Sequence, residues 1–367
     1  MALGAANEPA IRVLVADGSP FMRVALTRMI QSHPRLRVVA EVANAREVLA
    51  QIARFDPDVI TLDIEMHNMD GLEILRRIME DHPKPVIVVS SVTREGAEET
   101  LEALALGAFD CIPKLVSSDS FNILSIRDQL LEKIFAASAA PPPLPPRLHE
   151  RMPEPPPDSR LPAALDFPPA VIAIGASTGG PKAIQEIIPR LPADFPAGIV
   201  IVQHMPPGFT SPFARRLGDL SRIAVREAAH GDHIRPGLAL VAPALSHITL
   251  SSCSPSGFCV HLSKTPAGTL HTPSVDVMML SAAEVCGSHV MGVIMTGMGS
   301  DGARGMKAIH DSGGYTIGQD ESSCSVYGMP RACAELGILD RVVPLSRLSE
   351  EILWAARSPA ASWKPSI

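Results

Sequence analysis

Short apolar runs alternate with amphipathic segments along the first third of the chain. The apolar runs cover residues 11–16, 37–42, 58–63, 85–90 and 110–114, and segments with helical spacing cover residues 21–32, 45–55, 71–81 and 98–107. Continuous apolar strands that alternate with amphipathic helices are typical of a parallel sheet covered on both faces. Five such strands predict a flavodoxin-like, doubly wound domain over residues 10–135.

The same alternation returns in the second half of the chain. Apolar runs at residues 170–176, 198–203 and 290–297 each precede a helical stretch. Between them, residues 238–252 and 257–263 have a more β-like pattern, which predicts a hairpin or an extension at the edge of the sheet. We therefore expect a second doubly wound, Rossmann-like α/β domain over residues 170–357.

A proline-dense stretch separates the two patterns. It reads "AAPPPLPPRLHERMPEPPPDSRLPAALDFPP" from residue 139 to residue 169. Proline has no amide donor and favours an extended, semi-rigid spacer, so residues 136–169 are predicted to form a linker. A ligand for a proline-reading module is the alternative interpretation of this stretch.

The composition of the chain indicates which kinds of partner and which cellular location to expect. The formal net charge of the 367 residues is −7, and no block of Lys and Arg is present, which argues against nucleic acid or an anionic membrane as a partner. No secretory signature or long apolar run is found, so we expect no membrane insertion and a cytoplasmic location. No C-x-x-C pair or metal-ligand spacing occurs, so the cysteines are expected to be reduced thiols. They are Cys111, Cys253, Cys259, Cys286, Cys324 and Cys333.

Four polar residues fall at the ends of predicted strands in the first domain. Asp17 ends the first strand, Asp63 the third, Ser90 the fourth and Lys114 the fifth. Each alone is more often a helix cap or a solvated turn residue. In a doubly wound sheet, however, all four converge on the ligand-binding edge. This set suits phosphoryl transfer: one carboxylate attacks phosphorus, and a divalent cation held by oxygens offsets charge. The hydroxyl and the amine neutralise the phosphoryl oxygens.

A serine turn follows the first strand of the second domain. Residues 175–179, "GASTG", fit G-x-S-x-G, in which a tight strand-to-helix turn exposes a serine, here Ser177. The amides at the start of the next helix would stabilise negative charge there. A helix cap by Ser177 and a dinucleotide-binding loop are the alternatives, although the glycines do not have the G-x-G-x-x-G spacing.

A base and an orienting acid follow the neighbouring strands. His204 comes at the end of residues 198–203, and Asp301 follows residues 290–297. A buried histidine and a helix-capping aspartate are the alternatives for the two residues taken singly. Because Ser177 and these two residues follow strands expected to lie side by side, the pattern predicts a hydrolytic triad. The other nearby base, His310, falls within the helix predicted after Asp301.

Several longer motifs resemble known families. The stretches "DVITLDIEMHNMDGLEIL", "VIVVSSVT" and "GAFDCIPK" resemble the receiver domain of bacterial two-component response regulators. The stretches "IGASTGGPKAI", "QHMPPGFT", "PSVDVMM", "TGMGSDGARG" and "QDESSCSVYGMP" resemble the catalytic domain of chemotaxis protein-glutamate methylesterases. A receiver, a linker and this catalytic domain, in that order, are the arrangement of the methylesterase family.

The resemblance to receivers implies that Asp63 accepts a phosphoryl group, that Ser90 is the switch hydroxyl and that Lys114 senses the phosphate. It also implies a Mg²⁺ site formed by Asp17 and Asp63. In receivers the first strand usually ends in two adjacent acids, whereas here Gly18 follows Asp17. Losing one carboxylate weakens a hard-cation site, unless Asp17 or Glu65 compensates as a direct ligand.

The resemblance to methylesterases implies that Ser177 is the nucleophile, His204 the general base and Asp301 its orienting partner, with Thr178 and Met298 at the oxyanion. It implies hydrolysis of glutamate γ-methyl esters and deamidation of glutamine on chemoreceptor cytoplasmic helices, with no cofactor. A chemotaxis-type histidine kinase would phosphorylate the receiver, which would gate the active site. Phosphorylation-independent control, a non-catalytic signalling scaffold and a general esterase for small esters are the alternatives.

Overall fold

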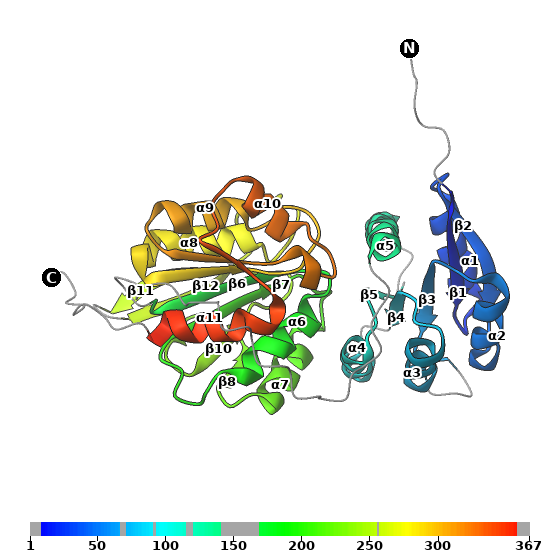
Figure 1. The fold of residues 1–367 in the computed structure, drawn as a ribbon, viewed down its shortest axis with the longest axis horizontal. Coiled ribbons are helices and arrows are strands. Elements are labelled where there is room, and N and C mark those ends of the chain that lie inside the picture. The colour runs from blue at the N-terminus through cyan, green and yellow to red at the C-terminus, as the bar shows by residue number, and fades with distance from the viewer. Residues whose placement is uncertain are drawn as a thin grey trace, which may run out of the picture. The chain divides into compact units, whose positions relative to one another are not determined.

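The computed structural model describes residues 9–66, 71–90, 93–114, 120–140, 169–254 and 257–357. The chain divides into two units, Met1–Glu150 and Arg151–Ile367, and the division falls within the predicted linker. Each unit contains its own parallel sheet (Figure 1). The proline-dense residues 141–168 lie outside the described ranges.

The first unit is built on a parallel sheet with the strand order β2-β1-β3-β4-β5. This is the order of flavodoxin-like domains, so the predicted fold of the first domain is confirmed. Every residue of β3 and β4 is buried, as expected for strands covered on both faces. The strands are β1 (Ile11–Ala16), β2 (Leu36–Val42), β3 (Val59–Asp63), β4 (Val86–Ser90) and β5 (Asp110–Pro113).

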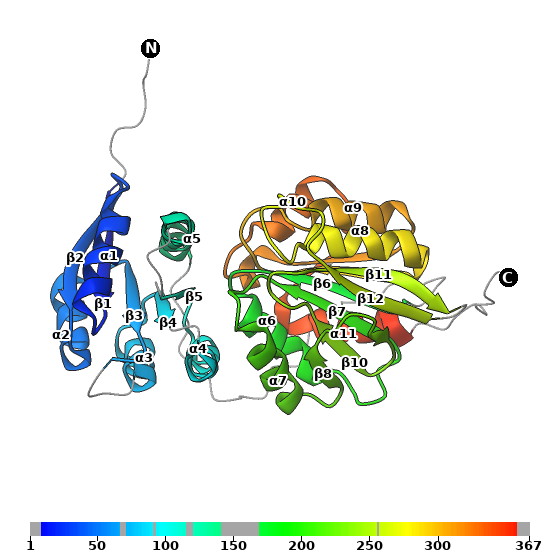
Figure 2. The ribbon, with the colours of Figure 1, turned by 180° about the vertical axis from the view of Figure 1, so that it is seen from behind.

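Helices cover both faces of this sheet. Two of them, α1 and α5, pack together, and α3 packs between α2 and α4 on the other side (Figure 1, Figure 2). The helices are α1 (Pro20–Gln31), α2 (Ala45–Phe55), α3 (Gly71–Asp81), α4 (Arg94–Leu106) and α5 (Ser120–Ala139). Helix α5 runs past the predicted domain end at residue 135, because its apolar face continues through the buried Ile134 and Ala137. Residues 136–139 are therefore helical rather than linker.

The second unit contains a parallel seven-stranded sheet with the order β15-β14-β13-β6-β7-β10-β8. The chain adds strands on one side of β6 and then crosses to β13 on its other side, so the topological switch point lies between β6 and β13. The predicted doubly wound α/β fold is confirmed here too. The strands are β6 (Val171–Ala176), β7 (Gly198–Gln203), β8 (Ala224–Glu227), β10 (Leu238–Val241), β13 (Val290–Ile294), β14 (Tyr315–Gln319) and β15 (Arg341–Val343).

Two layers of helices enclose this sheet (Figure 1, Figure 2). One layer contains α8 (Val275–Cys286), α9 (Ala303–Asp311) and α10 (Met329–Glu335), and the other contains α6 (Gly180–Ile187), α7 (Thr210–Leu220) and α11 (Leu345–Arg357). Three short 3₁₀ helices complete the unit: η1 (Ile188–Arg190), η2 (Gly287–His289) and η3 (Glu321–Ser323). Among the helices that the structure describes in either unit, none is long and apolar enough to cross a membrane.

A separate three-stranded sheet contains β11 (His247–Ser254), β12 (Gly257–Ser263) and β9 (His233–Ile234). The predicted stretch divides between both alternatives: β11 and β12 form the hairpin, while its first residues form β10, which extends the main sheet beyond β7. Ile248, Leu250 and Val260 from the three-stranded sheet are buried in one core with Met278 and Ala282 of α8. This apolar face packs on the helix layer, and the hairpin therefore leaves the plane of the main sheet.

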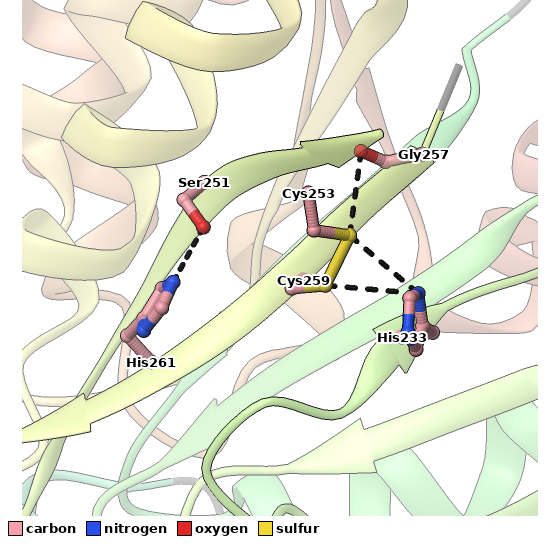
Figure 3. The surroundings of a disulfide bond; sticks show 6 residues. All are labelled: His233, Ser251, Cys253, Gly257, Cys259 and His261. Carbon is pink, nitrogen blue, oxygen red and sulfur yellow. Dashed lines mark hydrogen bonds between the residues drawn. A yellow bond between two sulfur atoms is a disulfide. The ribbon is translucent and has the colours of Figure 1, made fainter. Parts of the chain in front are cut away.

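The structure corrects the expectation that all the cysteines are free thiols. Cys253 and Cys259 form a disulfide across the hairpin, with their Cα atoms 5.7 Å apart (Figure 3). A register irregularity between Ser252 and Ser254 places Cys253 beside the partner strand. The spacing of the two cysteines in the sequence does not predict this disulfide, because only the register of the hairpin brings the two residues together. The remaining four cysteines are free and buried.

Candidate active site

The carboxyl ends of three adjacent strands bring Ser177, His204 and Asp301 to one edge of the seven-stranded sheet. Ser177 directly follows β6 and His204 directly follows β7, while Asp301 lies in the loop between β13 and α9. The order β13-β6-β7 makes these strands neighbours, as the apolar pattern predicted. The edge includes the switch point between β6 and β13, where open α/β sheets bind their ligands.

His204 and Asp301 form a hydrogen-bonded pair. His204 Nε2 lies 2.9 Å from Asp301 Oδ2, and both side chains are largely buried. The other ring nitrogen, Nδ1, is buried and has no hydrogen-bond partner among the described residues. A neutral imidazole that donates its Nε2 proton to the carboxylate keeps the Nδ1 lone pair free to accept a proton.

Asp301 is held by the start of helix α8. Its Oδ1 accepts hydrogen bonds from Ser274 Oγ at 2.8 Å and from the Asp276 amide at 3.0 Å, and its Oδ2 accepts one from the Val275 amide at 2.8 Å. Burial raises the pKa of Asp301, but the bonds from His204 and the helix amides outweigh it and bring the pKa well below its ordinary value. This aspartate therefore stays ionised beside the imidazole.

The two helices that meet at this site cap each other. Asp301 precedes α9, yet the N-cap of α9 is Gly302, which makes no side-chain bond. The cap of α9 comes from α8: Asp276 Oδ1 accepts hydrogen bonds from the amides of Gly302 at 3.0 Å and Gly305 at 2.9 Å. The alternative that Asp301 caps its own helix is thus wrong, because its carboxylate is directed to the start of the neighbouring helix.

The turn that carries Ser177 is fixed by main-chain hydrogen bonds. The Ser177 amide donates to the Thr296 carbonyl at 3.0 Å, and the Ser177 carbonyl accepts from the Gly180 amide at 2.8 Å. Helix α6 begins after Gly179, an N-cap with φ of 77° and no side-chain capping bond. The alternative that Ser177 serves as the helix cap is therefore wrong, and a residue with this positive φ is favourable only as glycine.

A buried glutamine links the serine turn to the histidine. Gln203 Nε2 donates to the carbonyls of both Ser177 and His204 at 2.9 Å, and the side chain is only 1% exposed. A Cβ on Gly180 would lie 2.0 Å from Gln203 Oε1, so only glycine leaves room for this amide. Gln203 is not among the predicted site residues, although a polar residue that ends an apolar strand next to a candidate base was a usable signal.

The predicted oxyanion residues lie close to Ser177. The Thr178 carbonyl accepts a hydrogen bond from Thr296 Oγ1 at 2.9 Å. Met298 follows Gly297, whose Cβ, if it had one, would lie 2.8 Å from Ser177 Cβ. The main chain that leads to Met298 therefore packs directly against the serine. The oxyanion roles of Thr178 and Met298 stay predictions.

The receiver unit brings its predicted residues to the carboxyl edge of its sheet. Lys114 Nζ lies 2.8 Å from both Asp63 Oδ1 and Glu65 Oε2, and the Glu65 amide donates to Asp63 Oδ1 at 2.9 Å. Burial lowers the pKa of Lys114, but the two carboxylates outweigh it and raise that pKa above its ordinary value. Ser90 Oγ donates to the Gly96 carbonyl at 3.0 Å, which connects β4 to the first turn of α4.

Asp17 provides a test of whether this edge fits a cation. Its side chain is fully buried; Oδ1 accepts from the Ser19 amide at 2.8 Å, and Oδ2 has no hydrogen-bond partner among the described residues. Burial and the nearby charge of Asp63 raise the pKa of Asp17 to about 6. An unpartnered carboxylate oxygen near a second carboxylate fits a hard divalent cation. Gly18 is exposed, and Arg23 donates to the Asp17 carbonyl at 2.8 Å.

Comparisons with known proteins agree with this architecture. Residues 172–352 match the CheB methylesterase family model, and residues 13–123 match the response regulator receiver domain model. A protein-glutamate methylesterase/protein-glutamine glutaminase of Oleidesulfovibrio alaskensis is 43% identical over 94% of this chain and 98% of its own length. The chain belongs to this family.

A relative of the same name from Symbiobacterium thermophilum is 44% identical and covers 93% of this chain and 96% of its own length. Among solved structures, the catalytic domain of Thermotoga maritima CheB methylesterase matches at 39% identity with a TM-score of 0.49, over 50% of this chain and 97% of that chain. The family models and the two curated relatives confirm the predicted family and its enzyme class, a methylesterase that carries a response regulator receiver.

One further residue of this CheB-type site, His271, is not among the predicted site residues. The His271 ring stacks on His204, with centroids 4.1 Å apart and an interplanar angle of 23°. Burial, together with the nearby His204, lowers the pKa of His271 to about 4, so its ring is neutral near pH 7. Its position just before the "PSVD" stretch that binds Asp301 was the available signal.

Proposed function

We propose that this chain hydrolyses glutamate γ-methyl esters, and deamidates glutamine, on the cytoplasmic helices of methyl-accepting chemoreceptors. The observation that carries the proposal is the His204–Asp301 pair at 2.9 Å, at the same sheet edge as Ser177. The relatives are named for these two activities, which supports the choice of substrate group. A cytoplasmic location follows from this substrate.

In the proposed reaction, His204 Nδ1 takes the proton of Ser177 Oγ while that oxygen attacks the ester carbonyl. The Asp301 carboxylate stabilises the imidazolium that forms. When the tetrahedral intermediate collapses, His204 returns the proton to the departing oxygen and methanol leaves. Water, activated by the same imidazole, then hydrolyses the acyl-enzyme to glutamate. An amide substrate follows the same steps, with ammonia as the leaving group.

The oxyanion is assigned to the main chain around Thr178 and Met298. The close approach of Gly297 to Ser177 supports this assignment, because it brings the main chain that leads to Met298 next to the proposed nucleophile. Fixed amide donors in a partly buried turn stabilise the developing negative charge without having to reorganise during the reaction. No cofactor takes part in these steps.

Replacement of the nucleophile tests the proposal. Ser177→Ala is expected to lower the rate of methanol release from methylated receptor membranes by at least about 10³-fold, since the triad acts as a unit. Ser312→Ala is the control, because Ser312 is an exposed residue that donates only to the Ala308 carbonyl at the end of α9. Methanol release by folded Ser177→Ala at the wild-type rate would refute the assignment. Activity on short free esters but not on receptors would favour a general esterase.

We further propose that phosphorylation of Asp63 by a chemotaxis-type histidine kinase controls this activity. In the dephosphorylated state Lys114 pairs with Asp63, so a phosphoryl group on Asp63 would draw Lys114 and the Ser90 hydroxyl to its oxygens. The receiver would then favour an arrangement with an accessible active site. Asp17 and Asp63 would hold Mg²⁺, which offsets the phosphoryl charge when bound. Glu65 would have to release Lys114 to join them.

Treatment with a small phosphodonor tests this control. The wild type is expected to gain methylesterase activity, Asp63→Asn to gain none, and Gly18→Asp to respond at lower Mg²⁺ concentration because it restores a second acid. Equal activity for all three proteins with and without the donor would refute control by phosphorylation. It would instead favour regulation by partner binding alone.

A further inference from the structure

The three-stranded sheet brings two sulfurs and an imidazole together, away from the catalytic edge. The β12–β9 register sets Cys259 opposite His233, and Cys253 follows from β11 at the irregular end of the hairpin (Figure 3). The three ligand atoms lie within 4.8 Å of one another. Two of the residues, His233 and Cys253, are exposed, while Cys259 is buried. Neither the catalytic mechanism nor the receiver uses them.

The imidazole is placed symmetrically with respect to the two sulfurs. His233 Nδ1 lies 3.5 Å from Cys253 Sγ and 3.6 Å from Cys259 Sγ. A tetrahedral zinc site with bonds of about 2.3 Å to sulfur and about 2.05 Å to nitrogen sets each nitrogen–sulfur separation at about 3.5 Å. The imidazole therefore already has the spacing that a shared ion requires.

We propose that the thiol form of Cys253 and Cys259, together with His233, binds one Zn²⁺ ion. A dithiol, which is oxidised to its own disulfide, or a phosphine, which is oxidised to a phosphine oxide with oxygen from water, supplies two electrons. The electrons break the sulfur–sulfur bond, and two protons from the reductant or from water complete the two thiols. Each thiol loses its proton when zinc binds, and the sulfurs then separate to about 3.8 Å in a tetrahedral site. Thiolate and imidazole ligands select a borderline-soft ion of this kind rather than Mg²⁺ or Ca²⁺.

The fourth ligand of this site is water. Among the described residues, no carboxylate belongs to the group of ligand atoms that lie within 4.8 Å of one another, and Oδ2 of the neighbouring Asp232 already accepts hydrogen bonds from Arg226 and from the Ala229 amide. Exposure of His233 and Cys253 gives the ion and one water access from solvent. The site thus differs from a closed four-ligand structural zinc site and leaves one position open.

Zinc titration of the full chain with a chromophoric competitor tests the proposal. After reduction by a phosphine, the wild type is expected to bind one equivalent of Zn²⁺ that the oxidised wild type does not bind. Cys253→Ser/Cys259→Ser is expected to lose this equivalent, and His233→Ala to bind it at least about tenfold more weakly. The control is His230→Ala, which removes a nearby imidazole that accepts from the Leu262 amide and is expected to leave the affinity unchanged.

Substitution by Co²⁺ reports the ligands directly. The reduced wild type is expected to show sulfur-to-cobalt charge-transfer bands and intense visible bands of a tetrahedral ion, both absent from the oxidised protein. Comparing the two oxidation states of one polypeptide keeps the test valid even where a variant fails to fold. Equal zinc binding by reduced and oxidised wild type would overturn the proposal, and so would unchanged affinity in folded His233→Ala.

Discussion

Gln203 offers a sharp test of how the active site is positioned. Its Nε2 group donates to the carbonyls of Ser177 and His204, both at 2.9 Å, while its Oε1 is buried without a partner. The residue touches no reacting atom in the proposed mechanism, so it acts by holding the nucleophile turn and the base together. Gln203→Leu removes both donors with little change in side-chain volume.

The size of the effect follows from the two lost hydrogen bonds. A buried hydrogen bond contributes about 1 kcal/mol net, so the two together contribute about 2 kcal/mol to the alignment of the turn. If this energy is lost mainly from the transition state, kcat/KM falls about 30-fold. The free energy of unfolding is expected to fall by less than this, because leucine also removes the buried, unpartnered Oε1, which destabilises the wild type. Gln203→Glu is expected to be worse, since a carboxylate would face two carbonyl oxygens.

Steady-state methanol release and thermal unfolding of the same preparations provide the assay. Gln185→Leu is the matched control, because Gln185 lies on α6 and its buried Nε2 has no partner among the described residues. Gln185→Leu is expected to keep kcat/KM within about twofold of the wild type, because a side-chain nitrogen without hydrogen bonds contributes little to the alignment of the site. Activity of folded Gln203→Leu within threefold of the wild type would refute the positioning role.

The raised pKa of Asp17, about 6 against an ordinary 3.8, means that the folded receiver binds a proton more tightly than the unfolded chain does. The stability of the folded receiver should therefore fall as pH rises from about 4 to about 6, by roughly 3 kcal/mol at most. Hydrogen exchange, measured without Mg²⁺, should show this loss in the wild type but not in Asp17→Asn. His271→Phe is expected to keep most activity at pH 7, because the neutral His271 ring serves as an aromatic wall, whereas His271→Ala should lose up to roughly tenfold in kcat/KM. Gly297→Ala would put a Cβ 2.3 Å from Met329 Sδ and 2.8 Å from Ser177 Cβ, so we expect about 1–3 kcal/mol of destabilisation and lower activity, with both measured on one preparation. The Asp17 prediction would be contradicted if the stability difference between the wild type and Asp17→Asn did not change with pH. Equal activity of the two His271 variants would contradict the role of the ring. Wild-type melting temperature and turnover in Gly297→Ala would contradict the packing argument.

Most of the fold could be predicted because the central strands of both sheets are buried on both faces. A run such as β3, with every residue buried, needs no alternation of polar residues and stands out as a continuous apolar segment. Helix α5 was not among the predicted helical segments, and its end was hard to place because a proline-dense stretch follows it directly. The β11–β12 sheet was harder still, because its separation from the main sheet depends on packing against α8, which no local pattern encodes.

The candidate site, too, contains residues that could be predicted from the sequence and residues that could not. Ser177, His204 and Asp301 could be placed from the sequence because each follows its own strand, and parallel strands bring their carboxyl ends to one edge. Gln203 and His271 could not be assigned so easily, since each acts through a side-chain contact with a residue on another segment. The disulfide was missed for the same reason, because a six-residue spacing becomes a contact only in one hairpin register.

The helix caps explain why the acid of the pair can be both buried and charged. A buried carboxylate ordinarily takes up a proton, but the amides of Val275 and Asp276 and the Ser274 hydroxyl stabilise the ionised form of Asp301. The two amides belong to the first turn of α8, where backbone donors have no partner within the helix and need one from elsewhere. The loop between β13 and α9 adds to the Ser274 N-cap of α8, so the hydrogen bonds that join the two helices also fix the charge of the Asp301 carboxylate and its direction toward His204. The geometry of the His204–Asp301 pair is therefore set by hydrogen bonds that also complete the start of a helix.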